Sequence, residues 1–305
     1  MDDRSKASEH EPRRASRWVN RRTVLRACAG LAVGGPMAAS GYVVGIEPHW
    51  VQVVRRDLPV AELDDALVGK TLAQISDPHV GPIVEDQYLR RAVKQTAALK
   101  PDMVAITGDI MTYRNDGEIE RSADILSGLG QPPLGAFAVL GNHDYGPGVR
   151  RNDLAVAMTR ALGEHNIIML RNAYMDVGEG LRVAGLDDLW SRRFEPEHVL
   201  PAMRKGRSSL VLCHNPDSAD TGNWHDFQGW ILCGHTHGGQ IQPPFGGRPP
   251  ILPVNNPRYC AGEVAVPGGA RLYINRGLGY THRVRFNARP EITLFTLTRG
   301  EAIRS

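Results

Sequence analysis

Short apolar runs alternate with polar, glycine-containing turns along most of the chain after residue 70. An apolar run that breaks at a glycine or a polar residue is typical of a buried strand that ends in a tight turn. We therefore expect principal strands at Thr71–Ser76, Met103–Thr107, Ala136–Leu140, Ser209–Cys213 and Trp230–Leu232. Further strands are expected at Leu181–Ala184, Leu272–Asn275 and Ile292–Leu297, with a peripheral strand and linker at Val51–Asp65.

Helical periodicity fills the gaps between the first of these strands. Apolar positions recur at helical spacing between Gly81 and Pro101, and two more helices are expected at Ile119–Leu129 and Leu154–His165. Strand–helix–strand alternation with short connections predicts parallel strands joined by right-handed crossovers. The strands that follow the helical half are too many for one sheet. We therefore expect an α/β fold built as a four-layer αββα sandwich, with two mixed β-sheets flanked by helices.

Each principal strand is followed by a turn that contains Asp, Asn or His. In α/β sheets, binding sites form where the carboxyl ends of the strands converge. Imidazole nitrogens and side-chain oxygens at such a place are suited to hold transition metals. The candidate donors are Asp77, His79, Asp109, Asn142, His214, His235 and His237. Seven donors are enough for two metal ions, and the glycines beside them allow the backbone a close approach.

Composition narrows the function classes. The chain of 305 residues is 42% hydrophobic and 23% charged, which is ordinary for a globular protein. Residues 1–30 hold eight Arg/Lys and four Asp/Glu, a net charge of +4, which leaves 28 basic and 29 acidic side chains elsewhere. No basic stripe with interleaved aromatic residues is present, so we expect no nucleic-acid binding. Four histidines among seven donors favour Mn, Fe, Zn or Co over Mg or Ca.

The cysteines do not suggest a disulfide framework. Three of the four, Cys213, Cys233 and Cys260, follow the N-terminal segment, and none has CxxC spacing. Because Cys213 and Cys233 directly precede donor turns, a metal role is conceivable. Small buried strand residues are the preferred interpretation.

The motif order resembles that of the calcineurin-like metallophosphoesterases. The family pattern is D-x-H, G-D, G-N-H-D/E, H and G-H-x-H, and each element occurs here in that order between Asp77 and His237. The resemblance covers residues 70–297, nearly everything after the N-terminal segment. Segments typical of the exported bacterial branch, the YaeI/YkuE-type envelope phosphodiesterases, are Gly185–Trp190, His214–Pro216, Gly234–Gln240 and Asn275–Gly279.

The resemblance implies a binuclear metal centre with Asp109 as the shared ligand. The first ion would also take Asp77, His79 and His237, and the second Asn142, His214 and His235. The implied reaction is hydrolysis of a P–O bond by in-line attack of a metal-bridging hydroxide. Two divalent ions, two aspartates and one hydroxide leave a residual charge of +1, which favours an anionic phosphate oxygen over a neutral ester.

Four other residues are candidates for work on the substrate. By the resemblance, His143 protonates the leaving group or steadies the phosphoryl oxygens, and Asp144 orients the ring of His143 from behind. The alternative for His143 is a solvent-facing turn histidine. Arg114 and Arg276 are candidate ligands of the substrate phosphate, with surface salt bridging as the alternative for both. The Pro/Gly-rich segment Pro243–Pro253 is either a rigid surface connection or one wall of the substrate cleft.

Residues 1–46 predict a disordered basic segment followed by an export signal or membrane anchor. A basic region before an apolar run is typical of export signals, and Arg21-Arg22 resembles the twin-arginine type, although Asn20 and Val24 depart from its consensus. The alternative is a chance arginine pair ahead of a plain anchor. We expect export by the twin-arginine machinery to a periplasmic, extracytoplasmic or membrane-anchored location. The remaining chain divides into a peripheral strand and linker, 47–69, and a metallophosphoesterase domain, 70–305.

Three functions are compatible with these motifs. The leading hypothesis is a dimetal phosphodiesterase of the cell envelope, acting on a phosphoester that belongs to a lipid or another envelope component. A second enzyme hypothesis is a pyrophosphatase on lipid-linked nucleotide sugars of the UDP-diacylglucosamine type. The third is a non-catalytic metal-binding scaffold, which the complete set of motif residues disfavours.

Overall fold

The computed structural model of the protein describes residues 37, 39–178, 180–203, 208–221, 224 and 227–300. Two compact units are distinguished, Met1–Tyr42 and Val43–Ser305, and every strand and helix discussed below lies in the second. Within the described ranges, no helix combines the length and the apolar character that a bilayer crossing requires. Most of the predicted signal or anchor in residues 1–46 lies outside the described residues, which in this range are 37 and 39–46.

The first sheet of the described structure has six strands in the order β1-β12-β2-β3-β4-β5. Strands β2 to β5 run parallel to one another, whereas β12 is antiparallel to β2 and parallel to β1. Its strands are β1 (Gln52–Ala61), β2 (Thr71–Ile75), β3 (Met103–Thr107), β4 (Ala136–Val139), β5 (Ile167–Met169) and β12 (Glu291–Gly300). All ten residues of β1 pair with β12, so the predicted peripheral strand belongs to the sheet itself.

The second sheet of the described structure also has six strands, in the order β10-β11-β9-β8-β7-β6. Its four central strands are parallel, and an antiparallel strand lies at each edge. Its strands are β6 (Ala173–Val177), β7 (Leu181–Gly185), β8 (Ser209–Leu212), β9 (Trp230–Cys233), β10 (Gly262–Ala265) and β11 (Arg271–Ile274). Both sheets are therefore mixed, as predicted.

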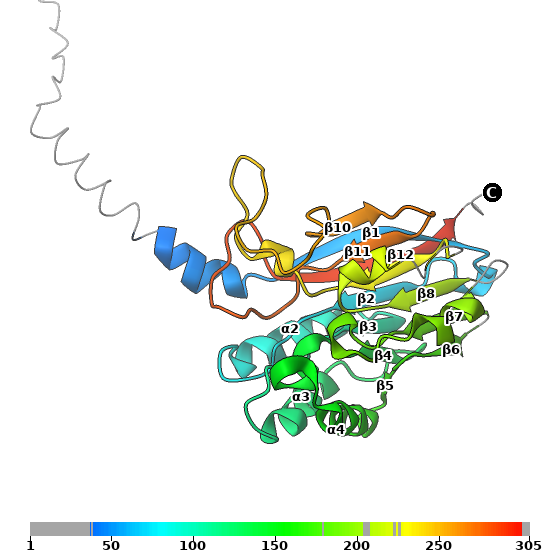
Figure 1. Cartoon of the computed structure of the whole chain (residues 1–305), viewed down its shortest axis with the longest axis horizontal. Coiled ribbons are helices and arrows are strands. Elements are labelled where there is room, and N and C mark those ends of the chain that lie inside the picture. Colours follow the sequence, from blue (N-terminus) through cyan, green and yellow to red (C-terminus); the bar gives the residue numbers. More distant parts are fainter. Residues whose placement is uncertain are drawn as a thin grey trace, which may run out of the picture. The chain divides into compact units, whose positions relative to one another are not determined.

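Three α-helices lie together on one side of the strand layers, as Figure 1 shows. They are α2 (Asp86–Ala98), α3 (Gly117–Ser127) and α4 (Asn152–Gly163). Their apolar residues recur at helical spacing, so each helix buries one face against the first sheet. In α2, for example, Leu89, Ala92, Val93 and Thr96 are buried while Arg90 and Lys94 between them are exposed.

A second apolar core lies between the two sheets. Successive side chains of a strand point to opposite faces of its sheet. In β9, Trp230 and Leu232 pack into the core between the sheets, whereas Ile231 and Cys233 pack into a further core on the outer face of the second sheet. Short 3-10 helices at Leu200–Met203 and Pro216–Asp220 contribute to that outer core. The predicted arrangement of two sheets flanked by helices is confirmed, with the difference that short 3-10 helices cover the second sheet among the described residues.

Candidate metal centre

The seven predicted donors converge at the carboxyl ends of strands from both sheets. Asp77 and His79 follow β2, Asp109 follows β3 and Asn142 follows β4, while His214, His235 and His237 follow β8 and β9. All seven side chains are buried. Donors that are far apart in the sequence therefore form one cluster, because parallel strands present their carboxyl ends at the same edge of the sandwich.

The backbone of this cluster is strained. Residues with positive φ are disfavoured by roughly 1–2 kcal/mol each unless they are glycine. Five of the seven donors adopt such angles: Asp77 (51°), His79 (50°), Asp109 (48°), His235 (72°) and His237 (51°). Strain of this kind persists only where the surrounding structure over-determines it, and it concentrates at functional sites.

Two glycines let the donor turns approach one another closely. A Cβ atom at Gly141 would lie 2.2 Å from Oδ1 of Asp109. A Cβ atom at Gly234 would lie 1.9 Å from Oγ of Ser76 and 2.3 Å from Oδ2 of Asp77. The β4 and β9 turns are thus packed directly against the carboxylates, which is the close approach that the flanking glycines predict.

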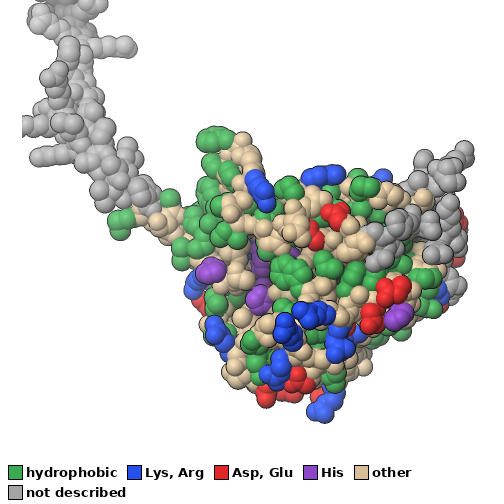
Figure 2. All heavy atoms as spheres, viewed as in Figure 1, with side chains coloured by type: hydrophobic (Ala, Val, Ile, Leu, Met, Phe, Trp, Pro, Cys, Tyr) green, Lys and Arg blue, Asp and Glu red, His purple; other side chains and the backbone are tan. Residues whose placement is uncertain are grey.

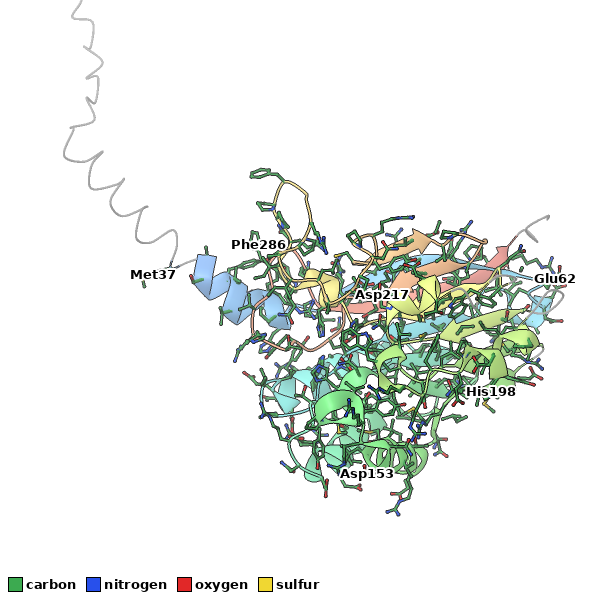
Figure 3. The ribbon with its side chains drawn as sticks, in the orientation of Figure 1. Met37, Glu62, Asp153, His198, Asp217 and Phe286 are labelled. Carbon is green, nitrogen blue, oxygen red and sulfur yellow. The ribbon has the colours of Figure 1, made fainter. Side chains whose placement is uncertain are left out.

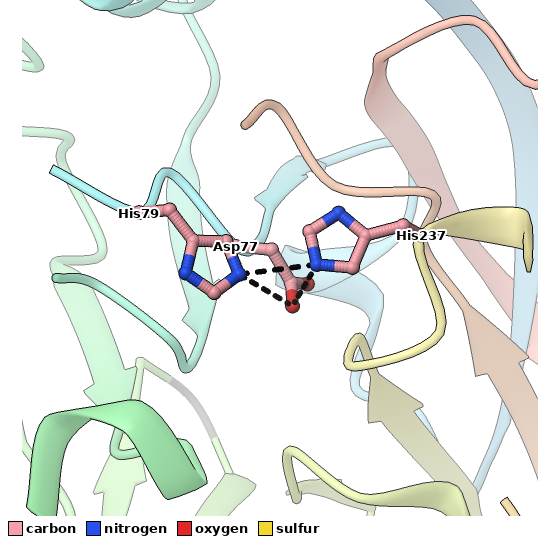
Figure 4. Close-up of side chains that lie close together, drawn as sticks. All are labelled: Asp77, His79 and His237. Carbon is pink, nitrogen blue, oxygen red and sulfur yellow. Dashed lines mark hydrogen bonds and ion pairs between the residues drawn. The ribbon is translucent and has the colours of Figure 1, made fainter. Parts of the chain in front are cut away.

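The first donor set comprises Asp77, His79 and His237 (Figure 4). The Nε2 atoms of His79 and His237 are 3.1 Å apart. Oδ1 of Asp77 lies 3.4 Å from Nε2 of His237 and 4.0 Å from Nε2 of His79. Two nitrogens at this separation are spaced as neighbouring ligands of one ion with bonds of about 2.1 Å.

The second donor set comprises Asp109, His214 and His235. Nδ1 of His235 lies 3.1 Å from Nε2 of His214, and that Nε2 lies 3.3 Å from Oδ2 of Asp109. The same Oδ2 lies 3.6 Å from Nε2 of His79 in the first set. One carboxylate oxygen therefore faces nitrogens of both sets, as a bridging ligand must.

Hydrogen bonds on the far side of each ring fix which nitrogen faces the centre. Nδ1–H of His214 donates to the carbonyl of Thr107 (2.8 Å), and Nδ1–H of His237 to that of Gly279 (3.3 Å). In His235 the arrangement is reversed, because Nε2–H donates to the carbonyl of Pro253 (2.9 Å). In the neutral rings the lone pairs therefore lie on Nε2 of His214, Nε2 of His237 and Nδ1 of His235, the three atoms that point inward.

The protonation chemistry of the cluster fits metal ions. Burial lowers the pKa of His79 and of His235 to about 3, so both rings keep a neutral lone pair. Burial raises the pKa of Asp77 to about 7. His214 opposes this rise, and the Asp109 carboxylate adds to it. Oδ1 of Asn142 is buried and accepts no hydrogen bond from any described residue. Bound cations would favour the ionised form of the Asp77 carboxylate and would be coordinated by Oδ1 of Asn142.

His143 faces the same centre from the β4 turn. A ring nitrogen of His143 lies within 4.8 Å of donor atoms of His79 and Asp109, and its ring stands edge-on to that of His79 at a centroid distance of 4.8 Å. Its backbone N–H donates to Oδ1 of Asp109 (2.8 Å). The side chain is half-buried, so the ring can reach both the cluster and a bound substrate.

Asp144 lies elsewhere than predicted. Its carboxylate accepts hydrogen bonds from the backbone N–H groups of Gly141 (2.8 Å), Ile110 (3.2 Å) and Met111 (3.0 Å). Both oxygens are thereby directed at the β3 and β4 turns and not at the His143 ring. The reason is local: in the 3-10 turn Asn142–Tyr145, Asp144 reaches back to the N–H that precedes the turn. Asp144 braces the donor turns instead of orienting His143.

The two candidate arginines do not line the recesses beside the cluster. Nε of Arg276 lies 2.7 Å from Oε2 of Glu291, and its Nη2 donates to Gln52 (3.1 Å). The guanidinium is therefore held against β12 and β1 by an ion pair. This resembles the salt-bridge alternative, except that the pair is largely buried and not on the surface. Arg114 is exposed, and its backbone N–H donates to the Glu118 carboxylate.

Two recesses meet at Asn142 and His143. The smaller, about 240 Å³, is bordered by Thr112, Tyr113 and the Gly146–Val149 segment. The larger, about 460 Å³, is predominantly apolar and runs past His235 and His237. Its apolar lining includes Trp190, Ile241, Ile251, Pro253 and Val284. The segment Pro243–Pro253 therefore contributes to a wall of the cleft and is not only a surface connection.

Trp190 is a site residue that the sequence motifs did not single out. Its ring stands edge-on to that of His235 at a centroid distance of 4.7 Å, and 44% of its surface is exposed in the larger recess. The 3-10 turn Leu189–Ser191 places it there, with Asp188 accepting a hydrogen bond from the Trp190 N–H. Only its place in the segment Gly185–Trp190 hinted at a role.

Comparisons with known proteins point to one family. The model of the calcineurin-like phosphoesterases matches residues 70–239. Phosphodiesterase YaeI of Escherichia coli is 31% identical over 92% of this chain and 99% of its own, and the uncharacterized metallophosphoesterase YkuE of Bacillus subtilis is 31% identical over 92% and 98%. UDP-2,3-diacylglucosamine pyrophosphatase LpxG of Chlamydia trachomatis is 27% identical over 82% of this chain and 90% of its own.

Proposed function

Because the chain belongs to the calcineurin-like phosphoesterase family and is therefore a phosphoester hydrolase, we propose that it cleaves a phosphodiester at a centre of two divalent metal ions. The position of Asp109 carries this proposal, since its Oδ2 lies 3.6 Å from His79 Nε2 and 3.3 Å from His214 Nε2. The residues that would hold the ions are Asp77, His79, Asp109, Asn142, His214, His235 and His237.

The donor set also bears on which ions these are. Four imidazoles among seven donors favour Mn, Fe, Zn or Co. Two such ions would polarise the phosphoryl group and make a water acidic enough to attack it near neutral pH. His143, which borders both recesses, would give a proton to the departing oxygen. Asp144 keeps the β3 and β4 turns in register so that Asp109 and Asn142 stay aligned.

The unequal recesses suggest how the two arms of a diester lie. The apolar recess of about 460 Å³, with Trp190 and Ile251 in its wall, suits a lipid-bearing arm. The smaller recess beside Tyr113 suits a polar arm such as a headgroup or a sugar. Because one relative is named as a pyrophosphatase on a diacylated nucleotide sugar, a lipid-linked nucleotide diphosphate is the second candidate substrate.

A substrate panel tests this assignment. Protein reconstituted with Mn, Fe, Zn or Co is assayed against nitrophenyl diesters, nitrophenyl monoesters, lipid-bearing diesters and nucleotide-diphosphate lipids. We expect hydrolysis of diesters over monoesters, with a lower KM for the lipid-bearing substrates. Replacing Trp190 with Ala should raise KM for lipid-bearing diesters while leaving kcat/KM for the small nitrophenyl diester less changed. A preference for monoesters would contradict the proposal.

We further propose that the protein is exported by the twin-arginine route, on the basis of Arg21-Arg22 ahead of a Gly/Ala-rich apolar run. The prediction is that changing both arginines to lysine blocks translocation and leaves folded protein inside the cell. Lysine keeps the positive charge, so a general secretory signal would tolerate the change. Fractionation of cells that express either form decides the point: unchanged delivery would mean a general signal or a plain anchor.

A further inference from the structure

The segment 243–253, which follows the donor turn of β9, forms a projecting loop (Figure 1). Phe245 is 100% exposed and Ile251 is 68% exposed. Gly246 and Gly247, with φ of 82° and 118°, make the turn beside Phe245 in a conformation that other residues rarely adopt. The space-filling view in Figure 2 shows hydrophobic side chains over much of this projection. A fully exposed Phe leaves apolar surface in water, which contact with an apolar phase would remove.

Other exposed apolar residues belong to the same end of the molecule. The base of the loop pairs with residues 281–289 through the Ile241–Phe286 bridge, and Phe286 lies beside that base in Figure 3. Residues 281–289 in turn bond to residues 43–50, since Arg285 N–H donates to Val43 and Arg289 Nε to Trp50. Ile46 is 56% exposed and Trp50 is 50% exposed. We call Val44, Ile46, Trp50, Phe245 and Ile251 the apolar end.

The charge around the apolar end is positive. The segments 43–50, 241–253 and 281–290 contain one acidic residue, Glu47, and it is buried. Arg248 is exposed, and the guanidinium of Arg289 lies 4.0 Å from the centroid of the Trp50 ring. Of Arg248, Arg283 and Arg289, only Arg283 is paired with a carboxylate in the described structure, that of Glu85. Exposed aromatic and aliphatic side chains among arginines are typical of surfaces that bind anionic lipid headgroups.

A lipid surface fits this end better than a protein partner. A stable protein interface buries about 800 Å² on each side and needs a complementary face, whereas a single narrow loop offers little area. Insertion into the boundary between headgroups and acyl chains requires only a few apolar side chains with basic residues beside them. We propose that the apolar end docks on an anionic lipid bilayer, with Phe245 inserted below the headgroups.

Docking would place the active site beside the lipid phase. Ile251 belongs both to the apolar end and to the wall of the 460 Å³ recess, so the two apolar surfaces are continuous. The same loop ends at Pro253, whose carbonyl accepts the Nε2–H of His235 (2.9 Å). The membrane-facing loop and a metal-facing histidine are therefore joined through one short segment.

A local fluorescence probe tests insertion in the full-length protein. Residues 1–46 are expected to contain an apolar segment, so overall vesicle binding does not isolate the loop. Phe245→Trp adds an indole at the loop, and Val156→Trp adds one at a 53% exposed position on α4 as the matched control. With vesicles of brominated phosphatidylcholine and phosphatidylglycerol, the indole added at 245 should lose most of its emission and the one at 156 should not. Equal quenching at both positions, or none at 245, would overturn the proposal.

A second comparison measures the contribution to binding. Relative to Val156→Asp, which shares residues 1–46, Phe245→Asp should weaken partitioning onto the same anionic vesicles by about 10- to 100-fold, the loss expected when a buried aromatic side chain is removed. Val156→Asp should leave partitioning unchanged. Because Phe245 does not line either recess, hydrolysis of a soluble nitrophenyl diester should not change in Phe245→Asp. If sedimentation shows that Phe245→Asp dissociates an oligomer while vesicle binding is unaffected, a second copy covers the loop and the lipid proposal is wrong.

Discussion

Replacing Asp109 with Asn is expected to abolish phosphoester hydrolysis and to release at least one metal ion. Oδ2 of Asp109 faces His79 Nε2 at 3.6 Å and His214 Nε2 at 3.3 Å. An amide of the same shape removes a negative charge from between two proposed cations. Loss of a partner outside the ligand shell typically costs 10- to 100-fold in metal affinity or activity, so loss of the bridging ligand should exceed that range.

The measurement is elemental analysis of the purified variant together with kcat/KM for a diester. Asp217→Asn is a matched control, because Asp217 is also buried but is not a proposed donor, and its carboxylate accepts hydrogen bonds from the backbone N–H groups of Asn255 and Asn256. The control should keep both ions. Two tightly held ions and full activity in Asp109→Asn would show that Asp109 is not the bridge.

The sequence predicted the donor cluster well because its signal is local. Each donor directly follows an apolar strand, and parallel strands bring such positions to one edge without further information. Strand β3 begins and ends at the predicted residues, Met103 and Thr107. Helix α3 begins and ends two residues before its predicted bounds, Ile119 and Leu129, because fraying and capping decide the last turn.

Two strands that the sequence did not predict, β6 and β10, lack a buried periodic pattern. In β6 (Ala173–Val177), four of five residues are exposed, and β10 (Gly262–Ala265) has no fully buried residue. Edge strands of this kind are stabilised by pairing with a neighbour rather than by their own apolar residues. Their partners, β7 and β11, are fixed only once the sheet has assembled.

Side-chain direction was the harder part of the site. Spacing alone places Asp144 next to His143, but the 3-10 turn directs its carboxylate to backbone N–H groups. Similarly, Arg276 follows β11 as a substrate ligand would, yet Glu291 of β12 is 2.7 Å from its Nε. The Arg276–Glu291 pair and the bonds of Asp144 to Ile110 and Met111 join different segments of the chain, which no local pattern encodes, whereas the bond of Asp144 to Gly141 is local to its own turn.

Replacing His143 with Ala should separate a catalytic role from a structural one. Its ring lies beside the donors of both sets and at the junction of the two recesses, where the departing oxygen of a diester would lie. General acid catalysis is typically worth about 10²- to 10⁴-fold in rate. A nitrophenolate leaves readily without a proton, whereas an alkoxide does not. The variant should therefore lose less on nitrophenyl esters than on alkyl esters.

Metal content distinguishes the remaining explanations. The His143 ring is not among the proposed ligands, so His143→Ala should keep both ions, as should the control His165→Ala at an exposed position beyond α4. Equal losses of kcat/KM on the two ester types would point to phosphate binding rather than proton transfer. Release of an ion would mean that His143, whose ring nitrogen lies within 4.8 Å of the His79 and Asp109 donor atoms, is itself a ligand.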